Sequence, residues 1–242
     1  MISCRRLPPL LVLCGALLLG PAAATRFVRA RPTAARAAEF MAARCRGRPV
    51  NHDCAGATHP ASRARAPPAG FAVVRMRRTV GRGAPAFARA SRALRAWKVH
   101  TPGGASAVFV APGRRVPRAA ATAARCYGGV AWVLNPCVVG YELLDAAGAR
   151  GGDRARAWAA VAAPGERFSA VSYSTLRGHL IAGEERLCVV LARDGAVECE
   201  VLSLSRGATA VGRALFPLMR PMQRRFFEDQ LRTVARAAQG PG

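Results

Sequence analysis

The stretch FSAVSYSTLRGHLIAGEERLCVVLARDGAVECEVLSLS, residues 168–205, decides the fold. Two β-prone runs, residues 187–191 and 197–204, flank the dipeptide Asp194-Gly195. Asp-Gly between such runs predicts a tight two-residue hairpin turn, because the turn needs a positive φ that glycine adopts without strain. In that register Cys188 and Cys199 are diagonal neighbours on one face, where a disulfide would be strained, so we interpret them as buried thiols.

The two arms of this hairpin belong to a larger sheet. Glu198 and Glu200 alternate with apolar residues, which gives the second arm one exposed face and one buried face. Residues 168–175 predict a third strand, and the segment around His179 predicts the connection into the hairpin. Three antiparallel strands with one apolar face are enough to begin a hydrophobic core.

Motifs in and around this stretch follow one another in a fixed order and spacing. They are Trp97-Lys98-Val99, Leu134-Asn135-Pro136-Cys137, Tyr173-x-Thr175-Leu176-x-Gly178-His179, Gly183-Glu184-Glu185-Arg186, Ser203-x-Ser205-Arg206 and Gln223-Arg224-Arg225-Phe226. The combination resembles DUF1990 (UPF0548), a family of uncharacterised bacterial and plant proteins, over residues 70–238. Four positions depart from the family pattern: Ser174, Arg177, Leu187 and Gly207. The resemblance implies a fold, and it implies no particular reaction.

The other segments of residues 70–238 predict strands and helices around this sheet. We expect strands over residues 71–80 and 105–110, and a helix over residues 85–97 that buries Phe87, Ala90, Leu94 and Trp97. Residues 126–141 predict either a strand pair or one kinked strand. Pro136 should mark an edge or a bend there, because proline cannot donate to a sheet. Residues 146–156 predict an exposed excursion.

The chain ends in an apolar stripe that is typical of a long helix. Pro221 suits the first turn of a helix, so we expect the final helix to begin there and to bury Phe226 and Leu231. The expected fold class is α+β, a curved antiparallel sheet with a long C-terminal helix. By analogy this is the helix-grip arrangement of the START and Bet v 1-like lipid-binding folds.

Residues 1–24 have the layout of a secretory signal peptide, with a basic start, a short apolar run and small residues at the cleavage region. The apolar run is too short to span a bilayer of ~30 Å as a helix. Residues 25–69 are rich in arginine and alanine and poor in acids. They predict either a transit-like segment with a linker or a disordered basic arm. The two parts together resemble the two-part address of plastid proteins in algae with secondary plastids; the alternative is plain secretion.

Composition narrows the classes of partner. The chain has 242 residues and a formal net charge of +24, and hydrophobic residues make up 51% of it, which excludes wholesale disorder. Such a charge would suit nucleic acid or an anionic membrane surface. The arginines are scattered, however, and no aromatic-rich basic stripe accompanies them. We therefore interpret most of them as solvated surface, expect no nucleic-acid binding and keep an anionic membrane surface as a candidate partner.

Few residues predict chemistry. His179 and Glu184 could form a general acid–base pair, but a turn-capping histidine and an ion pair between Glu185 and Arg186 would explain the same residues. No nucleophile elbow, phosphate-binding glycine loop or zinc-protease motif is present. We expect no catalytic residue and no cofactor.

The remaining cysteines and histidines do not predict a metal site. Cys45 and Cys54 are nine residues apart in a region that also holds His52 and His59, whereas a zinc site needs tightly spaced ligand pairs. Cys126 and Cys137 flank an apolar segment and could pair in an oxidising compartment, or remain free.

We therefore carry hypotheses from different classes. The first is a non-enzymatic binder of a lipid or small hydrophobic ligand, held between the sheet and the last helix. The second is a membrane-associated or plastid outer-envelope pore-type protein, as plant relatives of the family are described. The third is an enzyme using His179 and Glu184. The candidate ligand-binding residues are Tyr173, Thr175, His179, Glu184, Glu185, Trp132, Tyr141 and Phe226.

Overall fold

The computed structural model describes residues 24–60, 68–113, 116–126, 129–144 and 166–240. Within them, one antiparallel sheet of eight strands has the order β2-β8-β7-β6-β5-β4-β3, and β1 pairs with β5. Its strands are β1 (Arg26–Val28), β2 (Ala72–Arg82), β3 (Ser106–Val110), β4 (Ala119–Cys126), β5 (Ala131–Leu143), β6 (Arg167–Thr175), β7 (Ile181–Leu191) and β8 (Ala196–Gly207).

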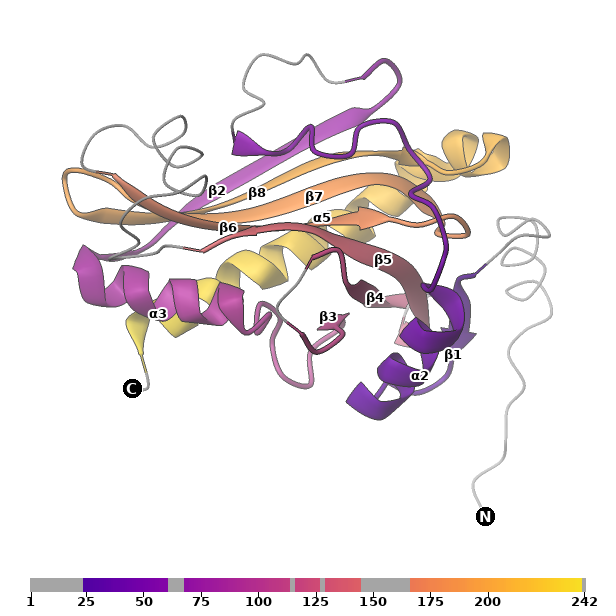
Figure 1. Ribbon diagram of the computed structural model, residues 1–242, viewed down its shortest axis with the longest axis horizontal. Helices are drawn as coiled ribbons and strands as arrows, with labels where there is room; N and C mark the ends of the chain where they lie inside the picture. Colours follow the sequence, from indigo (N-terminus) through magenta and orange to yellow (C-terminus); the bar gives the residue numbers. More distant parts are fainter. Residues whose placement is uncertain (1–23, 61–67, 114–115, 127–128, 145–165, 241–242) are drawn as a thin grey trace.

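In the same described ranges, three helices accompany the sheet: α2 (Ala34–Arg44), α3 (Gly83–Arg95) and α5 (Ala210–Gln239). Figure 1 shows α5 running along one face of the curled sheet, with α3 beside it. We call this the inner face, and the face that contacts α2 the outer face. A curled antiparallel sheet that holds a long C-terminal helix is the helix-grip α+β fold that the sequence predicted.

The largest hydrophobic core lies between the inner face and the helices α3 and α5. Leu94 of α3, Phe227 of α5 and Val189 of β7 are almost fully buried in it. Burying one such side chain contributes about 1.5–3 kcal/mol. The predicted helix over residues 85–97 is confirmed, although it begins at Gly83 and ends at Arg95.

The β7–β8 hairpin has a three-residue loop instead of the expected two-residue turn. Ala192 N–H donates to the carbonyl of Ala196 at 2.9 Å, and Gly195 takes φ +81° within the loop. The strands are therefore shifted by one residue, so Cys188 lies opposite Glu200, and Cys199 lies opposite Val189.

This shift separates the two cysteines. Because side chains alternate between faces, a one-residue slip moves a side chain to the other side of a sheet. Cys199 packs in the core under α5, whereas Cys188 packs in a small cluster with Phe168 and Ala170. The expectation that they share a face is wrong, and the expectation that both are buried thiols is confirmed.

The strands β4 and β5 were only partly predicted. The sequence of β4, AAATAARC, has Thr122 as its one β-branched residue and no aromatic residue to favour a strand, but pairing with β3 and β5 on its two sides holds it extended. β5 is one strand of 13 residues. Pro136 lies where β5 changes partner, between Leu134, which pairs with β1, and Cys137, which pairs with β6. Proline is tolerated at this local edge because no continuous ladder needs its N–H.

Helix α5 begins at Ala210, well before Pro221, so the predicted start of the helix is wrong. The Thr209 hydroxyl caps it by accepting from Gly212 N–H at 2.9 Å. Pro217 and Pro221 both lie inside the helix, where each removes one backbone hydrogen bond. This proline-containing half is also the more exposed half: Leu218 is 76% exposed, while Leu231 further along is 5% exposed.

Residues 24–60 pack against the sheet, so the structure differs from the expectation of a disordered arm for this part of residues 25–69. Thr33 caps α2, and Phe40 and Met41 of α2 pack against Trp132 on the outer face. Residues 1–23, which include most of the expected signal peptide, and the expected excursion at residues 146–156 lie outside the described residues.

The buried half of α5 should carry most of its stability. Replacing Leu231, which is 5% exposed, by alanine leaves a cavity under the helix, so Leu231→Ala should lower the free energy of unfolding by about 2–5 kcal/mol. Leu218→Ala makes the same change at an exposed position of the same helix and should alter the free energy of unfolding by no more than about 0.5 kcal/mol. Urea unfolding followed by circular dichroism measures both. Equal losses in the two variants would contradict the packing described above.

Candidate functional site

A narrow cavity of about 80 Å³ lies between the inner face of the sheet and α5. Six of the eight residues expected to bind a ligand line it: Tyr173, Thr175, His179, Glu184, Glu185 and Phe226. Pockets for drug-sized ligands measure roughly 300–1,000 Å³, so the space beneath the helix is largely filled by side chains. The cavity has room for a few water molecules or for the end of a longer molecule.

Glu185 is the buried carboxyl group of this cavity, 7% exposed. Gln230 of α5 donates from Nε2 to Glu185 Oε1 at 2.7 Å, and the side chain of Tyr173 also hydrogen-bonds to Glu185. Burial raises the pKa of Glu185 to about 7, and the hydrogen bonds from Tyr173 and Gln230 offset this only in part. Arg186, the expected ion-pair partner, instead binds Glu200 on the outer face, so that expectation is wrong.

His179 occupies the turn between β6 and β7 and is 8% exposed. Its Nδ1 accepts a hydrogen bond from Ile181 N–H at 2.8 Å, which agrees with the turn-capping interpretation. Burial, together with nearby His52, lowers the pKa of His179 to about 3. The ring is therefore neutral at physiological pH, and because Nδ1 accepts, its proton is on Nε2.

The carboxylate of Glu184 is engaged on the other side of the sheet. It accepts hydrogen bonds from Gly56 N–H at 2.6 Å and Thr58 N–H at 2.9 Å, and from the hydroxyls of Thr58 and Ser174. Hydrogen bonds from backbone amides to a charged carboxylate are strong, so Glu184 fastens residues 50–60, which we call the strap, to the outer face. Glu184 and Glu185 are adjacent in sequence and point to opposite faces of the sheet, so the carboxylate of Glu184 is engaged by the strap and that of Glu185 by α5.

Trp132 and Tyr141 were expected to bind a ligand, but the structure places both on the outer face. Trp132 packs beneath α2, and the guanidinium of Arg31 lies 5.8 Å from the centre of its ring. The hydroxyl of Tyr141 lies 3.1 Å from Thr58 Oγ1, under the strap. A β-bulge between Val139 and Tyr141 reverses the alternation of β5, which is why Tyr141 points outward.

A much wider cleft, of about 1120 Å³, opens between α5 and the edges of β3, β4 and β5. Its apolar wall on α5 consists of Leu215, Leu218, Met219, Pro221, Met222 and Phe226. Except for Phe226, none of these residues was expected at a site; Leu215, Leu218 and Met219 were missed because the helix was expected to begin at Pro221. The three- and four-residue spacing of leucines and methionines on both sides of that proline was the signal that could have found them.

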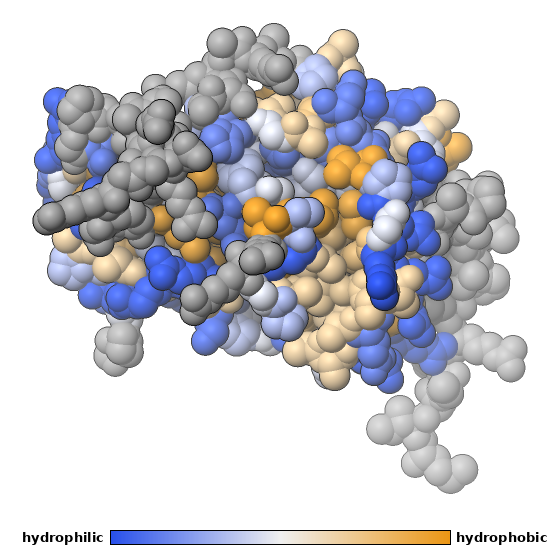
Figure 2. All heavy atoms as spheres, in the orientation of Figure 1, coloured by the Kyte–Doolittle hydropathy of each residue, from blue (hydrophilic) through white to orange (hydrophobic). Residues whose placement is uncertain are grey.

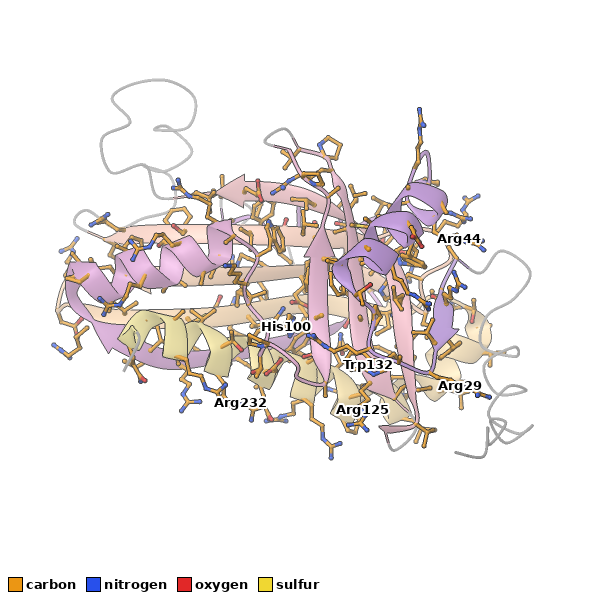
Figure 3. All side chains as sticks on the ribbon, turned by 90° about the horizontal axis from the view of Figure 1, so that it is seen from below. Arg29, Arg44, His100, Arg125, Trp132 and Arg232 are labelled. Atoms are coloured by element: carbon orange, nitrogen blue, oxygen red, sulfur yellow. The ribbon has the colours of Figure 1, made fainter. Side chains whose placement is uncertain are left out.

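Three arginines also line the cleft: Arg125 from β4, and Arg225 and Arg232 from α5. Seen from below in Figure 3, Arg125 and Arg232 lie along the same edge of the molecule, on the side where α5 runs. The cleft thus combines an apolar wall with positive charge near solvent.

A polar cluster closes one part of the cleft. Asp229 of α5 accepts from Ser106 Oγ at 2.7 Å and from Thr101 Oγ1 at 2.6 Å, and its Oδ2 lies 3.1 Å from His100 Nδ1. Burial alone would raise the pKa of Asp229, but these hydrogen bonds hold it well below its usual range. Both Ser106 and Asp229 contact the same nitrogen of His100, so the ring cannot pass a proton between them as the histidine of a serine protease triad does. The cluster ties β3 to α5.

Within the described ranges, no group of three or more His, Cys, Asp or Glu side chains is placed to hold a metal ion. No helix in the same ranges is long and apolar enough to cross a membrane. The described cysteines, which include Cys126 and Cys137, are free thiols.

The chain is similar to a known family and to several solved structures. The model of the family described as "Domain of unknown function (DUF1990)" matches residues 54–233. TTHA0849 from Thermus thermophilus is 12% identical, with a TM-score of 0.45 over 69% of this chain and 97% of that one. The di-domain ARO/CYC BexL from the BE-7585A biosynthetic pathway is 11% identical, with a TM-score of 0.40 over 71% and 51%.

A third solved structure, Ara h 8.0201, is 12% identical, with a TM-score of 0.34 over 68% of this chain and 97% of that one. No curated protein matches the chain. At these identities and TM-scores, the solved structures say nothing about a ligand or a reaction.

The raised pKa of Glu185 should appear as a pH dependence of stability. The folded state holds this proton up to a pH of about 7, whereas the ordinary pKa of a glutamate side chain is 4.5, so between these values the folded state binds more protons than the unfolded state. Protonated Glu185 therefore stabilises the folded state at low pH, and this contribution to the free energy of unfolding is lost as the pH rises from 4.5 through about 7. The total loss is roughly 3 kcal/mol, at ~1.4 kcal/mol for each pH unit.

The isosteric variant Glu185→Gln cannot ionise and should lack this loss. Urea unfolding at pH values from 4.5 to 8.5 measures the difference between the wild type and Glu185→Gln. Glu198→Gln, the same change on the outer face of β8, is the control. If the difference between wild type and Glu185→Gln stays constant across this pH range, Glu185 is not the buried acid described here.

Proposed function

This chain belongs to the DUF1990 family, and we propose that it is a non-enzymatic protein that binds a lipid or another small hydrophobic ligand. The observation that carries the proposal is the cleft of about 1120 Å³ beside α5. This volume is at the upper end of what small-molecule sites provide, and such sites are mostly apolar with a few polar groups.

The α5 wall of the cleft supports a ligand with a flexible apolar body. Met219 and Met222 have unbranched side chains that adapt to the shape of a bound molecule. Leu215 and Leu218 are 37% and 76% exposed, so apolar surface is left uncovered at the cleft. A ligand that covered these side chains would remove apolar area from water, at about 25 cal/mol for each Å².

The arginines of the cleft favour ligands with an anionic or strongly polar group at the solvent end. Arg225 and Arg232 are exposed on α5, and Arg125 approaches from β4. Guanidinium groups bind carboxylates and phosphates through paired hydrogen bonds. Glu228 and Asp229 also line the cleft, and Asp229 is already engaged by Ser106 and Thr101.

The alternative of an enzyme that uses His179 and Glu184 receives no support from the site. The hydrogen bonds of Glu184 go to the strap and to Ser174, and Nδ1 of His179 accepts from the backbone of its own turn. Both side chains therefore have structural roles that explain their presence.

A second candidate function, association with an anionic membrane surface, is favoured by the exposed half of α5. Val211 and Leu218 are 45% and 76% exposed, and Arg213, Arg220 and Arg224 are exposed on the same helix. Exposed apolar residues beside arginines are typical of helices that lie on anionic lipid surfaces. Figure 2, which views another side of the molecule, shows hydrophilic residues spread over the surface with small hydrophobic groups between them. A signal peptide, a transit peptide and a plastid location stay predictions.

Ligand binding is tested by native mass spectrometry after incubation with a mixture of C10–C18 fatty acids, alcohols and monoglycerides. The folded protein should retain bound molecules of this kind. Met222→Trp places a large ring at the wall of the cleft and should reduce the bound fraction severalfold. Val73→Trp, at an exposed position of β2 that does not line the cleft, should leave it unchanged. Recovery of protein without any bound molecule from the mixture would refute the proposal.

Membrane association is tested by sedimentation with vesicles. The protein should sediment with phosphatidylcholine vesicles that contain phosphatidylglycerol more than with pure phosphatidylcholine, and 0.5 M salt should release it, because salt screens surface charges. Leu218→Ser should weaken the binding, whereas Val73→Ser should not, since Val73 lies on β2. Equal sedimentation with neutral and anionic vesicles would contradict this second candidate.

A further inference from the structure

We propose that the narrow cavity beneath α5 holds the hydroxyl end of an otherwise apolar ligand, with the carboxyl group of Glu185 as the hydrogen-bond acceptor. The inference rests on the proposed function, because it assigns the inner end of the same ligand. It names the chemical class of that ligand as an amphipathic alcohol or phenol, with its hydroxyl group buried and its other end in the cleft.

The cavity adjoins the cleft, so one molecule can occupy both. Four residues line the two spaces in common: Ala124, Val133, Met222 and Phe226. Met222 is half-buried on α5 and has the most adaptable side chain of these four. A ligand whose body lies in the cleft can therefore extend past these shared residues into the cavity that Glu185 lines.

The groups around Glu185 leave acceptor capacity unused. A carboxyl group has several acceptor positions, and here it receives the amide of Gln230 and the hydroxyl of Tyr173. The other amide atom of Gln230, Oε1, is buried and has no hydrogen-bond partner among the described residues. An unpaired buried acceptor carries a penalty of about 1–3 kcal/mol unless another donor supplies the missing bond. A ligand hydroxyl that donates to an unused acceptor position of Glu185, which lines the cavity, would add a hydrogen bond to this cluster.

The lack of positively charged side chains in the cavity wall disfavours a ligand with an acidic end group. Among the described residues, neither arginine nor lysine lines the cavity, although the chain carries 37 of them. A carboxylate or phosphate in the cavity would lie beside Glu185 without a cation to offset its charge, which is costly in a buried site. An ether or an alkyl end would leave the acceptors unpaired. A hydroxyl group, which donates one hydrogen bond and can accept another from the hydroxyl of Ser205 in the cavity wall, fits best.

The experiment compares probes that differ only at one end: decanol, decyl methyl ether and decanoate, each titrated into the full chain by isothermal calorimetry at pH 8.5. This pH is above the pKa of Glu185, about 7, so its carboxylate can accept hydrogen bonds but cannot donate one. Decanol should bind at least tenfold more tightly than decyl methyl ether, because only the alcohol can donate to Glu185. Decanoate should bind more weakly than decanol at 0.5 M salt, where the arginines of the cleft are screened.

Glu185→Leu removes the acceptor with little change in volume, and it should reduce the preference for decanol over the ether to less than about threefold while the ether still binds. Glu198→Gln, on the outer face, should keep the full preference. Tyr173→Phe is the second variant, needed if Glu185→Leu does not fold. It removes a neighbouring hydroxyl, and decanol should still bind more tightly than decyl methyl ether, since Glu185 remains.

Equal affinity of the wild type for decanol and its ether would overturn this inference and leave the proposed function standing, because the apolar body would still bind. A cavity that is simply filled with water predicts that outcome. A preference for decanol that persists in Glu185→Leu would also overturn it. Failure of all three probes to bind would remove the inference together with the proposed function.

Discussion

The side chains of a β-strand alternate between the two faces of a sheet, and this constraint decides which residues of the protein meet under α5. In β7 it sends the carboxylate of Glu184 to the strap on the outer face and Glu185 to the helix on the inner face. Two local irregularities then set the alternation elsewhere. The three-residue loop at Gly195 fixes the register of β8 against β7, and the bulge after Val139 reverses the face of Tyr141.

From the sequence, the helices and strands were predicted well, but the face of the sheet on which each side chain lies was predicted less well. Long regular signals, such as the apolar stripe of α3 and the alternation around Glu198 and Glu200, gave the right elements because many residues contribute to each. Single-residue irregularities carry almost no local signal, although each moves every following side chain to the other face. For this reason Cys188 and Tyr141 were placed on the wrong side, whereas Tyr173 and Glu185, both expected at the ligand site, lie opposite each other on adjacent strands.

The cleft was missed for a different reason. Pro221 was interpreted as a helix start, but capping by Thr209 and packing of the later turns allow the helix to continue through two prolines. The turns that lose hydrogen bonds there are those with exposed leucines and half-buried methionines. The wall of the cleft is therefore the least tightly packed part of α5, and the narrow cavity beyond it lies under the middle of the helix, at Met222, Gln223, Phe226 and Phe227. A ligand that enters would meet an adaptable apolar surface first and a fixed carboxyl group last.

The most direct test of this arrangement is a pair of double-mutant cycles across the sheet and the helix, because coupling energies report contact between side chains. Stability is measured by urea unfolding for Glu185→Ala and Gln230→Ala, singly and together, and for Glu184→Ala with Gln230→Ala. Contact between Glu185 and Gln230 predicts a coupling energy of about 0.5–3 kcal/mol in the first cycle and a value near zero in the second. Coupling of Gln230 to Glu184 and none to Glu185 would mean that β7 presents the opposite face to α5, and it would contradict the account.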